Sequence, residues 1–231
     1  MDKIKIPLLL HQTWKNKGPS KYDRYAKSWK SITWLKRKFY TDNDIDNYMK
    51  INFPEFYNFF SKQINKVIEK VDFFRYAVLY KEGGIYADMD TEILDPKLLF
   101  SLLKHKIVLG YENTFGRRLI SQAVLISEKN NKFWYYLMVF IKKNYHPSKY
   151  PPNNTGPDIF SSFIKVYGNN FILTFCGLID SGPIITHHKG GVWRNTQLQY
   201  SKKFCLLCKK EYLQCNCYKG DWFTKITYKK K

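Results

Sequence analysis

A helix, two glycines, a short strand and two acids follow one another between residues 64 and 90, and this order constrains the fold most. Apolar residues recur at helical spacing from Ile64 to Tyr80, which predicts a helix with one buried face. Gly83 and Gly84 end this helix, because glycine readily adopts the left-handed conformation found at helix C-termini. The apolar run Ile85–Ala87 then predicts a short buried strand. A helix that turns directly into a buried strand is typical of α/β folds.

Strand-like and helix-like patterns alternate along most of the chain. The prolines of residues 147–157 predict a loop, and Pro54 starts a further short helix. This alternation predicts an α/β sandwich around a mainly parallel central sheet. We predict strands over residues 4–10, 34–40, 107–111, 123–126, 171–175 and 184–187, and helices over 20–29, 41–49, 96–104, 130–143 and 158–167.

Asp88 and Asp90 come directly after the predicted strand. Side chains alternate along an extended chain, so both carboxylates should point to one side and Met89 to the other. Two carboxylates this close repel each other unless a cation lies between them, and Mg²⁺ and Mn²⁺ prefer such oxygen ligands. Open α/β sheets also bind ligands at the carboxyl ends of their strands. The pattern is short and frequent, so by itself it leaves two interpretations open, a divalent metal site and a solvated acidic turn.

Asp72 and Arg75 lie one helical turn apart on the apolar side of the predicted helix. A charge on a core-facing surface is costly unless it is paired or serves a site. The pattern leaves two interpretations open, a buried structural ion pair and a functional pair.

The composition indicates a basic protein with a real core. The 231 residues include 39 Lys and Arg against 19 Asp and Glu, a net charge of +20 that attracts anionic partners. No apolar run is long enough to cross a bilayer, and Ile6–Leu10 is too short for a signal-peptide core. We therefore expect a cytoplasmic protein, peripheral at a membrane where anionic surfaces attract it, or located in the host cytoplasm if the chain is viral.

Residues 201–231 differ from the rest of the chain. They contain nine lysines and two acids, and four cysteines within thirteen positions. Such clustering predicts a structural Zn²⁺ clip, and the alternative is a set of free thiols. We expect a single domain over residues 1–200 and a basic, cysteine-rich tail over 201–231. The predicted zinc ligands are Cys205, Cys208, Cys215 and Cys217.

Five stretches together resemble a known family, the DXD sugar-binding glycosyltransferases. This group contains the fungal Och-type initiating mannosyltransferases and many bacterial capsular sugar transferases, and is distantly related to the clostridial glucosylating toxins. The stretches are LLLHQTW (8–14), FYTDNDI (39–45), VDFFRYAVLYKEGGIYADMDTEIL (71–94), NNTGPDIF (153–160) and ITHHKGGVW (185–193).

This resemblance implies a GT-A fold, which is a nucleotide-sugar-binding α/β sandwich. It also implies a hexosyltransferase that uses Mn²⁺ or Mg²⁺ and retains the anomeric configuration. The implied donor is a UDP- or GDP-sugar, and the implied acceptor is a glycan or a protein.

The resemblance also implies roles for individual residues. Asp88 and Asp90 hold the metal together with His187, and Asp88 also meets the donor ribose. Asp72 and Arg75 bind the hydroxyls of the donor sugar. The implied catalytic residues are Asp88, Asp90 and Arg75, and the remaining donor-binding residues are His11, Gln12, Thr13, Trp14, Thr155 and Gly156.

A second function remains open from the residues alone. The tail carries a net charge of +7 beside its cysteines. This composition favours a nucleic-acid or anionic-surface binding protein built on a degenerate transferase fold.

Overall fold

The computed structural model describes residues 3–18, 20–114, 117–147, 150–176 and 184–188. In chain order its elements are β1 (Leu9–Thr13), α1 (Asp23–Lys30), β2 (Lys36–Tyr40), α2 (Asp42–Asn52), α3 (Pro54–Asn58), the π-helical turn η1 (Phe59–Gln63), α4 (Val67–Glu82), β3 (Gly84–Ala87), β4 (Thr91–Ile93), α5 (Pro96–Leu102), β5 (Ile107–Thr114), β6 (Arg117–Ser127), α6 (Lys132–Asn144), α7 (Pro151–Asn154), α8 (Pro157–Tyr167), the 3-10 turn η2 (Gly168–Asn170), β7 (Thr174–Phe175) and β8 (Ile185–His187).

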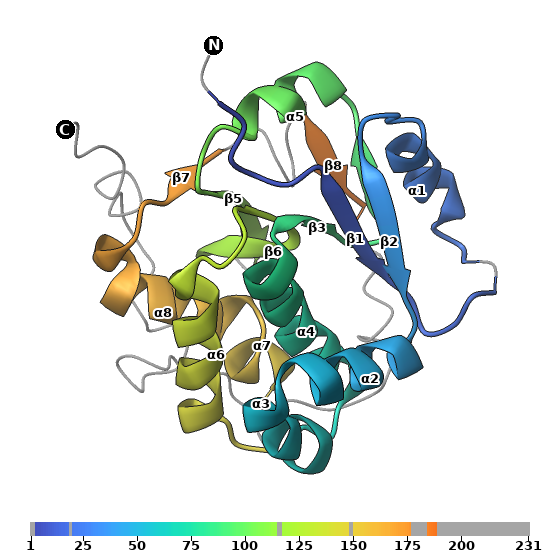
Figure 1. Ribbon diagram of the computed structural model, residues 1–231. Coiled ribbons are helices and arrows are strands. Elements are labelled where there is room, and N and C mark those ends of the chain that lie inside the picture. Colours follow the sequence, from blue (N-terminus) through green and yellow to red (C-terminus); the bar gives the residue numbers. More distant parts are fainter. Residues whose placement is uncertain (1–2, 19, 115–116, 148–149, 177–183, 189–231) are drawn as a thin grey trace.

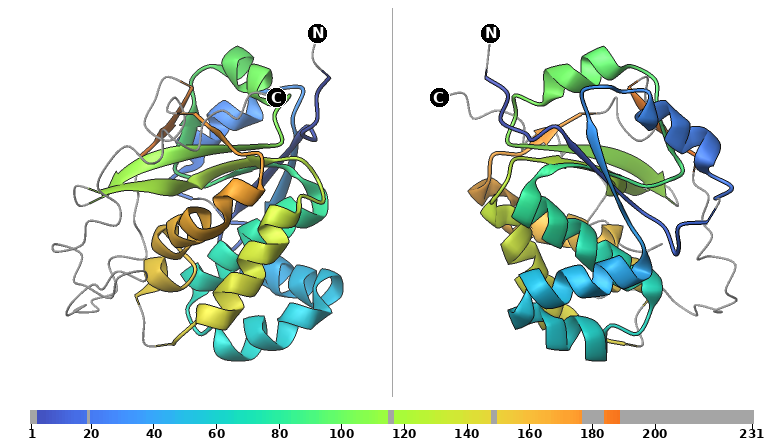
Figure 2. Two further views of the ribbon diagram at one scale, coloured as in Figure 1. Left: turned by 90° about the vertical axis from the view of Figure 1, so that its left-hand side faces the viewer. Right: turned by 45° about the vertical axis from the view of Figure 1, so that its right-hand side comes forward.

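A six-stranded sheet in the order β2-β1-β3-β6-β5-β7 forms the centre of the fold. Three of its five strand pairings are parallel, which confirms the predicted mainly parallel sheet. Figures 1 and 2 show α1 and α5 on one face of the sheet and α2, α4, α6 and α8 on the other. The strands β4 and β8 form a separate two-stranded sheet.

The pleat of the strands gives each face of the sheet its own apolar core. Tyr86 of β3 points into the aromatic-rich core on the α4 side, whereas Ile85 and Ala87 point into the core on the α1 and α5 side. Leu125 and Ile126 of β6 divide in the same way. The same alternation decides which side chains of β1 face which helix.

The first strand was predicted wrongly: residues 4–10 were expected to form it, but β1 spans Leu9–Thr13. The polar residues His11 and Gln12 lie inside this strand, and both side chains are fully buried. His11 Nε2 lies 2.9 Å from the Gly83 carbonyl, and Gln12 Oε1 accepts a hydrogen bond from Arg37 Nε at 2.7 Å. Partners distant in sequence allow these polar side chains to be buried.

The predicted apolar face of the long helix was also wrong. Ile64 precedes α4, and Val67 is 58% exposed. From Asp72 to Leu79 every residue is buried, because α4 contacts α2, α6, α7 and the sheet. A helix enclosed on all sides has no single apolar face for a pattern to reveal.

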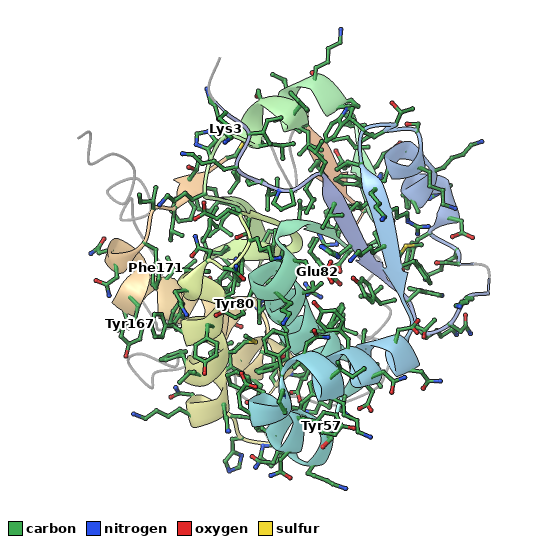
Figure 3. The ribbon with its side chains drawn as sticks, in the orientation of Figure 1. Lys3, Tyr57, Tyr80, Glu82, Tyr167 and Phe171 are labelled. Atoms are coloured by element: carbon green, nitrogen blue, oxygen red, sulfur yellow. The ribbon has the colours of Figure 1, made fainter. Side chains whose placement is uncertain are left out.

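Other predicted elements agree with the structure more closely. Thr41 caps α2 through a reciprocal pair of bonds with Asp44, as its position before an acidic first turn predicts. Residues 147–157 are not entirely loop, because they include α7. Glu82, labelled in Figure 3, ends α4 and binds Lys38 of β2 and Tyr48 of α2.

Two expectations concern parts of the chain that the structure does not describe, and one concerns the membrane. The proposed boundary near residue 200 and the four tail cysteines lie outside the described residues. Within the described part of the chain, every helix is too short or too polar to span a bilayer.

Gly84 allows β3 to run directly beside β1. Its φ angle is 96°, and a Cβ atom there would lie 2.6 Å from the Leu9 carbonyl oxygen. Neither the backbone conformation nor the contact suits any residue with a side chain.

We therefore expect Gly84→Ala to lower the free energy of unfolding by about 2 kcal/mol or more, since strain and a backbone clash coincide. Urea unfolding followed by circular dichroism measures this loss. Gly18→Ala is the matched control, since its Cβ would meet only the Asn16 side chain, and we expect a change within about 0.5 kcal/mol. Equal stability of the two variants would contradict the close approach of β3 and β1.

Candidate active site

The candidate site lies at the carboxyl ends of β1 and β3. After β1 the chain crosses to α1 on one face, whereas β3 is reached from α4 on the other face. The two strands are parallel neighbours, so this edge is a topological switch point. Ligands of open α/β sheets bind at such points.

The acidic pair lies in a turn rather than in an extended segment as predicted. The Asp88 amide donates to Ala123 O at 2.8 Å, and the Asp88 carbonyl accepts from the Thr91 amide and hydroxyl. Met89 and Asp90 form the turn between β3 and β4. The Met89 side chain is buried on the opposite side, against Tyr22, so the predicted same-side placement of the two carboxylates is confirmed.

Asp88, Asp90 and His187 form a cluster that fits a divalent metal. Their ligand atoms lie within 4.8 Å of one another, and His187 Nε2 is 3.4 Å from Asp90 Oδ2. His187 arrives through the pairing of β8 with β4, in which it lies opposite Thr91. Two carboxylates and an imidazole suit Mn²⁺, and two carboxylates suit Mg²⁺.

Arg75 connects this cluster to Asp72. Its Nη2 lies 3.1 Å from Asp72 Oδ1 and 3.5 Å from Asp88 Oδ1, and its Nη1 donates to Gln122 O at 2.8 Å. The side chain is almost fully buried over the Tyr86 ring, and its Nε has no partner among the described residues. The pair predicted on α4 therefore exists and also reaches the acidic turn.

Burial and neighbouring charges shift the pKa values of these groups in opposite directions. Burial raises the pKa of Asp72 to about 7, against the pull of Arg75 and of a hydrogen bond from Thr155. Burial lowers the pKa of Arg75, but Asp88 and the other nearby groups outweigh it and raise the pKa, so the guanidinium stays charged. Burial also raises the pKa of Asp88, which Arg75 opposes. Added positive charge beside Asp88 would favour its ionised form.

The end of β1 reaches the acidic turn through two hydroxyl groups. Thr13 Oγ1 lies 3.0 Å from Tyr86 Oη, and Tyr86 donates to Asp88 Oδ1 at 3.0 Å. His11 and Thr13 point to the α4 side, whereas the alternate residues Gln12 and Trp14 contact groups on the α1 side. Residues 11–14, all predicted to bind the donor, are thus divided between two faces of the sheet.

Of the two residues predicted to bind donor in this segment, Thr155 lies in the same hydrogen-bond network as Asp72, and Gly156 follows it. Thr155 Oγ1 donates to Asp72 Oδ2 at 2.9 Å, and the Thr155 carbonyl accepts from Tyr76 at 2.7 Å and from Gln122 at 3.2 Å. Gly156 packs so tightly that a Cβ would lie 2.5 Å from Pro152 Cα. The predicted residues from α4, β3, α7 and β8 are therefore brought to one place.

Glu69 is a site residue that sequence analysis missed. It is fully buried one turn before Asp72, and its carboxylate accepts from Asn154 Nδ2 at 3.0 Å and from the Tyr145 hydroxyl at 2.8 Å. Asn154 precedes Thr155, so Glu69 fixes the segment that delivers Thr155 to Asp72. Its helical spacing from Asp72 and Arg75 was the available signal.

Glu69→Ala removes one of the two acceptors of the buried Asn154 amide and the acceptor of the partly buried Tyr145 hydroxyl, so we expect a loss of about 1–3 kcal/mol in the free energy of unfolding. It should also raise the KM for donor, because Thr155 loses its support. Tyr145→Phe is the control that keeps the Glu69–Asn154 bond, and it should cost about 1 kcal/mol with an unchanged KM. A Glu69→Ala variant as stable as the parent would show that the bonds of this carboxylate to Asn154 and Tyr145 do not stabilise the fold.

Comparison with known proteins identifies the region that carries this site. Residues 13–110 match the model of the glycosyltransferase sugar-binding region containing the DXD motif. That segment includes Asp72, Arg75 and both acids of the turn.

Two relatives and one solved structure illustrate what the chain is similar to. An uncharacterized glycosyltransferase of Acanthamoeba polyphaga mimivirus is 28% identical over 90% of this chain and 82% of its own length. Inositol phosphoceramide mannosyltransferase 3 of Schizosaccharomyces pombe is 34% identical over 40% of this chain. The matched segment spans only 27% of that protein. The PaToxG glycosyltransferase structure is 17% identical with a TM-score of 0.54, covers 71% of this chain and 72% of its own, and shares the fold.

Proposed function

We propose that this chain, a glycosyltransferase whose residues 13–110 form the DXD-containing sugar-binding region, transfers a hexose from a nucleotide-diphosphate sugar with metal assistance and retention of configuration. The observation that carries the proposal is the continuity of Asp72, Arg75 and Asp88 with Asp90 and His187. A sugar-binding ion pair and a metal-binding cluster that share one carboxylate suit the two ends of such a donor.

The buried pair provides hydrogen bonds for the sugar. Asp72 accepts from sugar hydroxyls, and Arg75 can donate from its unpartnered Nε. Thr155 orients the Asp72 carboxylate through its hydroxyl. The low exposure of both charges strengthens these contacts, because little water competes with them.

Asp88, Asp90 and His187 would hold Mn²⁺ or Mg²⁺. When bound, such an ion neutralises the negative charge that develops on a diphosphate leaving group. The chain's own residues place the carboxylates and the imidazole on one side of the turn, and Tyr86 orients Asp88 by a hydrogen bond. The basic surface of the protein adds attraction for an anionic donor.

Retention without a protein nucleophile is the mechanism that we propose. Asp72 and Asp88 are the carboxylates beside Arg75, and both are engaged by its guanidinium. An engaged carboxylate is a poor nucleophile. The bond between the anomeric carbon and the diphosphate oxygen would therefore break while the acceptor hydroxyl attacks on the same face, and the departing diphosphate would take the hydroxyl proton. The Arg75 and Asp72 contacts would hold the sugar in place.

The donor and acceptor are proposed by class. We propose a UDP- or GDP-hexose as donor and a glycan or protein as acceptor. The mannosyltransferase name of the fission-yeast relative supports hexose transfer. The alternative of a binding protein on a degenerate fold is less well supported, because the residues that we propose for the sugar and for the metal lie together in the described part of the chain.

Replacing Asp90 with Asn removes one metal ligand but keeps its shape. We expect Mn²⁺-dependent donor binding to fall more than about 100-fold, beyond the loss typical of residues that only support a ligand. Stability should stay the same or rise slightly, since repulsion with Asp88 is relieved. Calorimetry of UDP- and GDP-sugars with Mn²⁺ and with EDTA measures this, and Glu92→Gln, whose carboxylate binds His188, is the control. Donor binding that is as strong in EDTA as in Mn²⁺ would refute metal dependence.

Replacing Arg75 with Lys separates a sugar-binding role from a purely structural one. Lysine keeps the charge but lacks the planar fork that meets Asp72, Asp88 and the Gln122 carbonyl together. We expect donor turnover to fall about 100-fold or more while the circular dichroism spectrum is retained. Arg24→Lys on the exposed side of α1 is the control and should turn over donor normally. Normal turnover by a folded Arg75→Lys variant would assign the pair to structure alone.

A further inference from the structure

Large apolar side chains are exposed on the outer surface of α6, α8 and the segment that leads to β7. They are between 41% and 65% exposed, and we call them the α6–α8 patch: Tyr136, Val139, Val166, Tyr167 and Ile172. Two ring contacts connect the patch across its elements. The ring centroids of Tyr136 and Phe171 are 6.2 Å apart, and those of Tyr167 and Phe140 are 5.8 Å apart. The patch is therefore one surface, unlike the single exposed apolar side chains that any protein carries.

Lysines border this patch. One exposed stripe of α6 has a cation at each end and two apolar side chains between them, at helical spacing: Lys132, Tyr136, Val139 and Lys143. On α8, Lys165 directly precedes Val166. Residues 129–176 contain six lysines and a single acid, Asp158, whose side chain is buried. The exposed surface of this segment is thus apolar and cationic, with no carboxylate to neutralise it.

The patch lies away from the candidate active site. Ile172 leads into β7, the edge strand of the sheet, whereas the site lies at β1 and β3 in the other half of the sheet. Figure 3 labels Tyr167 and Phe171 at the outer edge of the molecule beside α8, and the left view of Figure 2 shows α6 and α8 together on that side. A partner bound to the patch would leave the acidic turn accessible.

The chemistry of the patch distinguishes among three kinds of partner. A second copy of this chain in a symmetric dimer would bring lysines against lysines, which like-charge repulsion disfavours. Nucleic acid is bound best by arginines and stacking rings, whereas residues 129–176 contain no arginine and three of the five patch residues are aliphatic. A bilayer with anionic lipids suits both components, because aliphatic side chains enter its apolar boundary and lysines attract its phosphates.

We propose that the α6–α8 patch docks the protein on the surface of a bilayer that contains anionic lipids. The three aliphatic side chains would enter the boundary between headgroups and acyl chains. The two tyrosines would keep their hydroxyls at the level of the headgroups. The bordering lysines would lay their alkyl stems along the apolar surface and place their charges beside lipid phosphates. The proposal goes beyond sugar transfer and does not depend on it, because no patch residue belongs to the candidate active site.

Flotation of the full chain with lipid vesicles measures this docking. Vesicles of neutral phosphatidylcholine are compared with vesicles that also contain about 30% phosphatidylserine, both at about 0.15 M salt. We expect the protein to partition at least about tenfold more strongly onto the anionic vesicles. Val139→Ser/Ile172→Ser keeps the net charge and should weaken this partitioning by about tenfold or more, since two apolar side chains no longer leave water on docking.

The matched control is Val67→Ser/Ile51→Ser. It removes the same two residue types from exposed positions on α4 and α2, outside the patch. This control should partition within about twofold of the parent, because distant sites act independently. Circular dichroism should show both double variants to be folded like the parent.

A second pair of variants tests the lysines. Lys132→Gln/Lys143→Gln should weaken partitioning onto anionic vesicles by about tenfold or more, because both charges lie beside the lipid surface. Lys27→Gln/Lys36→Gln removes the same charge from exposed positions on α1 and β2. It should change partitioning by no more than about threefold, since charges far from the bilayer are screened.

Three results would overturn the proposal. The first is equal partitioning onto neutral and anionic vesicles, or none onto either. The second is equal weakening by the patch and control apolar pairs, which would indicate attraction by overall charge without a docking surface. The third is a dimer in sedimentation, or a complex with a DNA duplex, that Val139→Ser/Ile172→Ser abolishes and the control pair retains. That result would assign the patch to a second copy or to nucleic acid.

Discussion

The buried guanidinium of Arg75 is the group on which the site depends. A nearly inaccessible cation is tolerable only if several partners surround it, and here they come from Asp72 on α4, Asp88 after β3 and the Gln122 carbonyl on β6. These partners fix α4, the acidic turn and the central sheet relative to one another. Thr155 then joins α7 to the same group through Asp72.

Local signals in the sequence were enough for much of this arrangement. The paired glycines, the acidic pair and the capped α2 each carry their cause within a few residues. The structure confirms that α4 ends at the glycines and that the two carboxylates share one side, although the acids lie in a turn and not in an extended segment. The errors in β1 and α4 have one physical origin. The polar groups of His11 and Glu69 are satisfied by Gly83, Asn154 and Tyr145, which are distant in sequence, so no local pattern marks His11 as buried and only its helical spacing from Asp72 marks Glu69. The roles of Trp14 and Gly156 stay predictions.

The pleat of β1 makes one strand serve two surfaces. Thr13 belongs to the hydroxyl chain that ends at Asp88, while its neighbours Gln12 and Trp14 belong to the side that carries Arg37. A one-residue shift in the register of β1 would exchange these sets and dismantle both sides. Gly84 helps to fix the register, because only glycine lets β3 approach Leu9 so closely.

Asp88 belongs both to the ion-pair network of Asp72 and Arg75 and to the cluster with Asp90 and His187. Its Oδ1 accepts from Tyr86 and lies 3.5 Å from Arg75, while the same carboxylate belongs to the cluster with Asp90 and His187. A cation bound by that cluster would change the strength of the ion pair between Asp88 and Arg75. A ligand that moves Arg75 away from Asp88 would in turn change the affinity of the cluster for the cation. Thermodynamic linkage requires the two effects to be equal. On the proposed function, cooperation between the two ends of a donor would follow from one shared carboxylate and would need no movement of the fold.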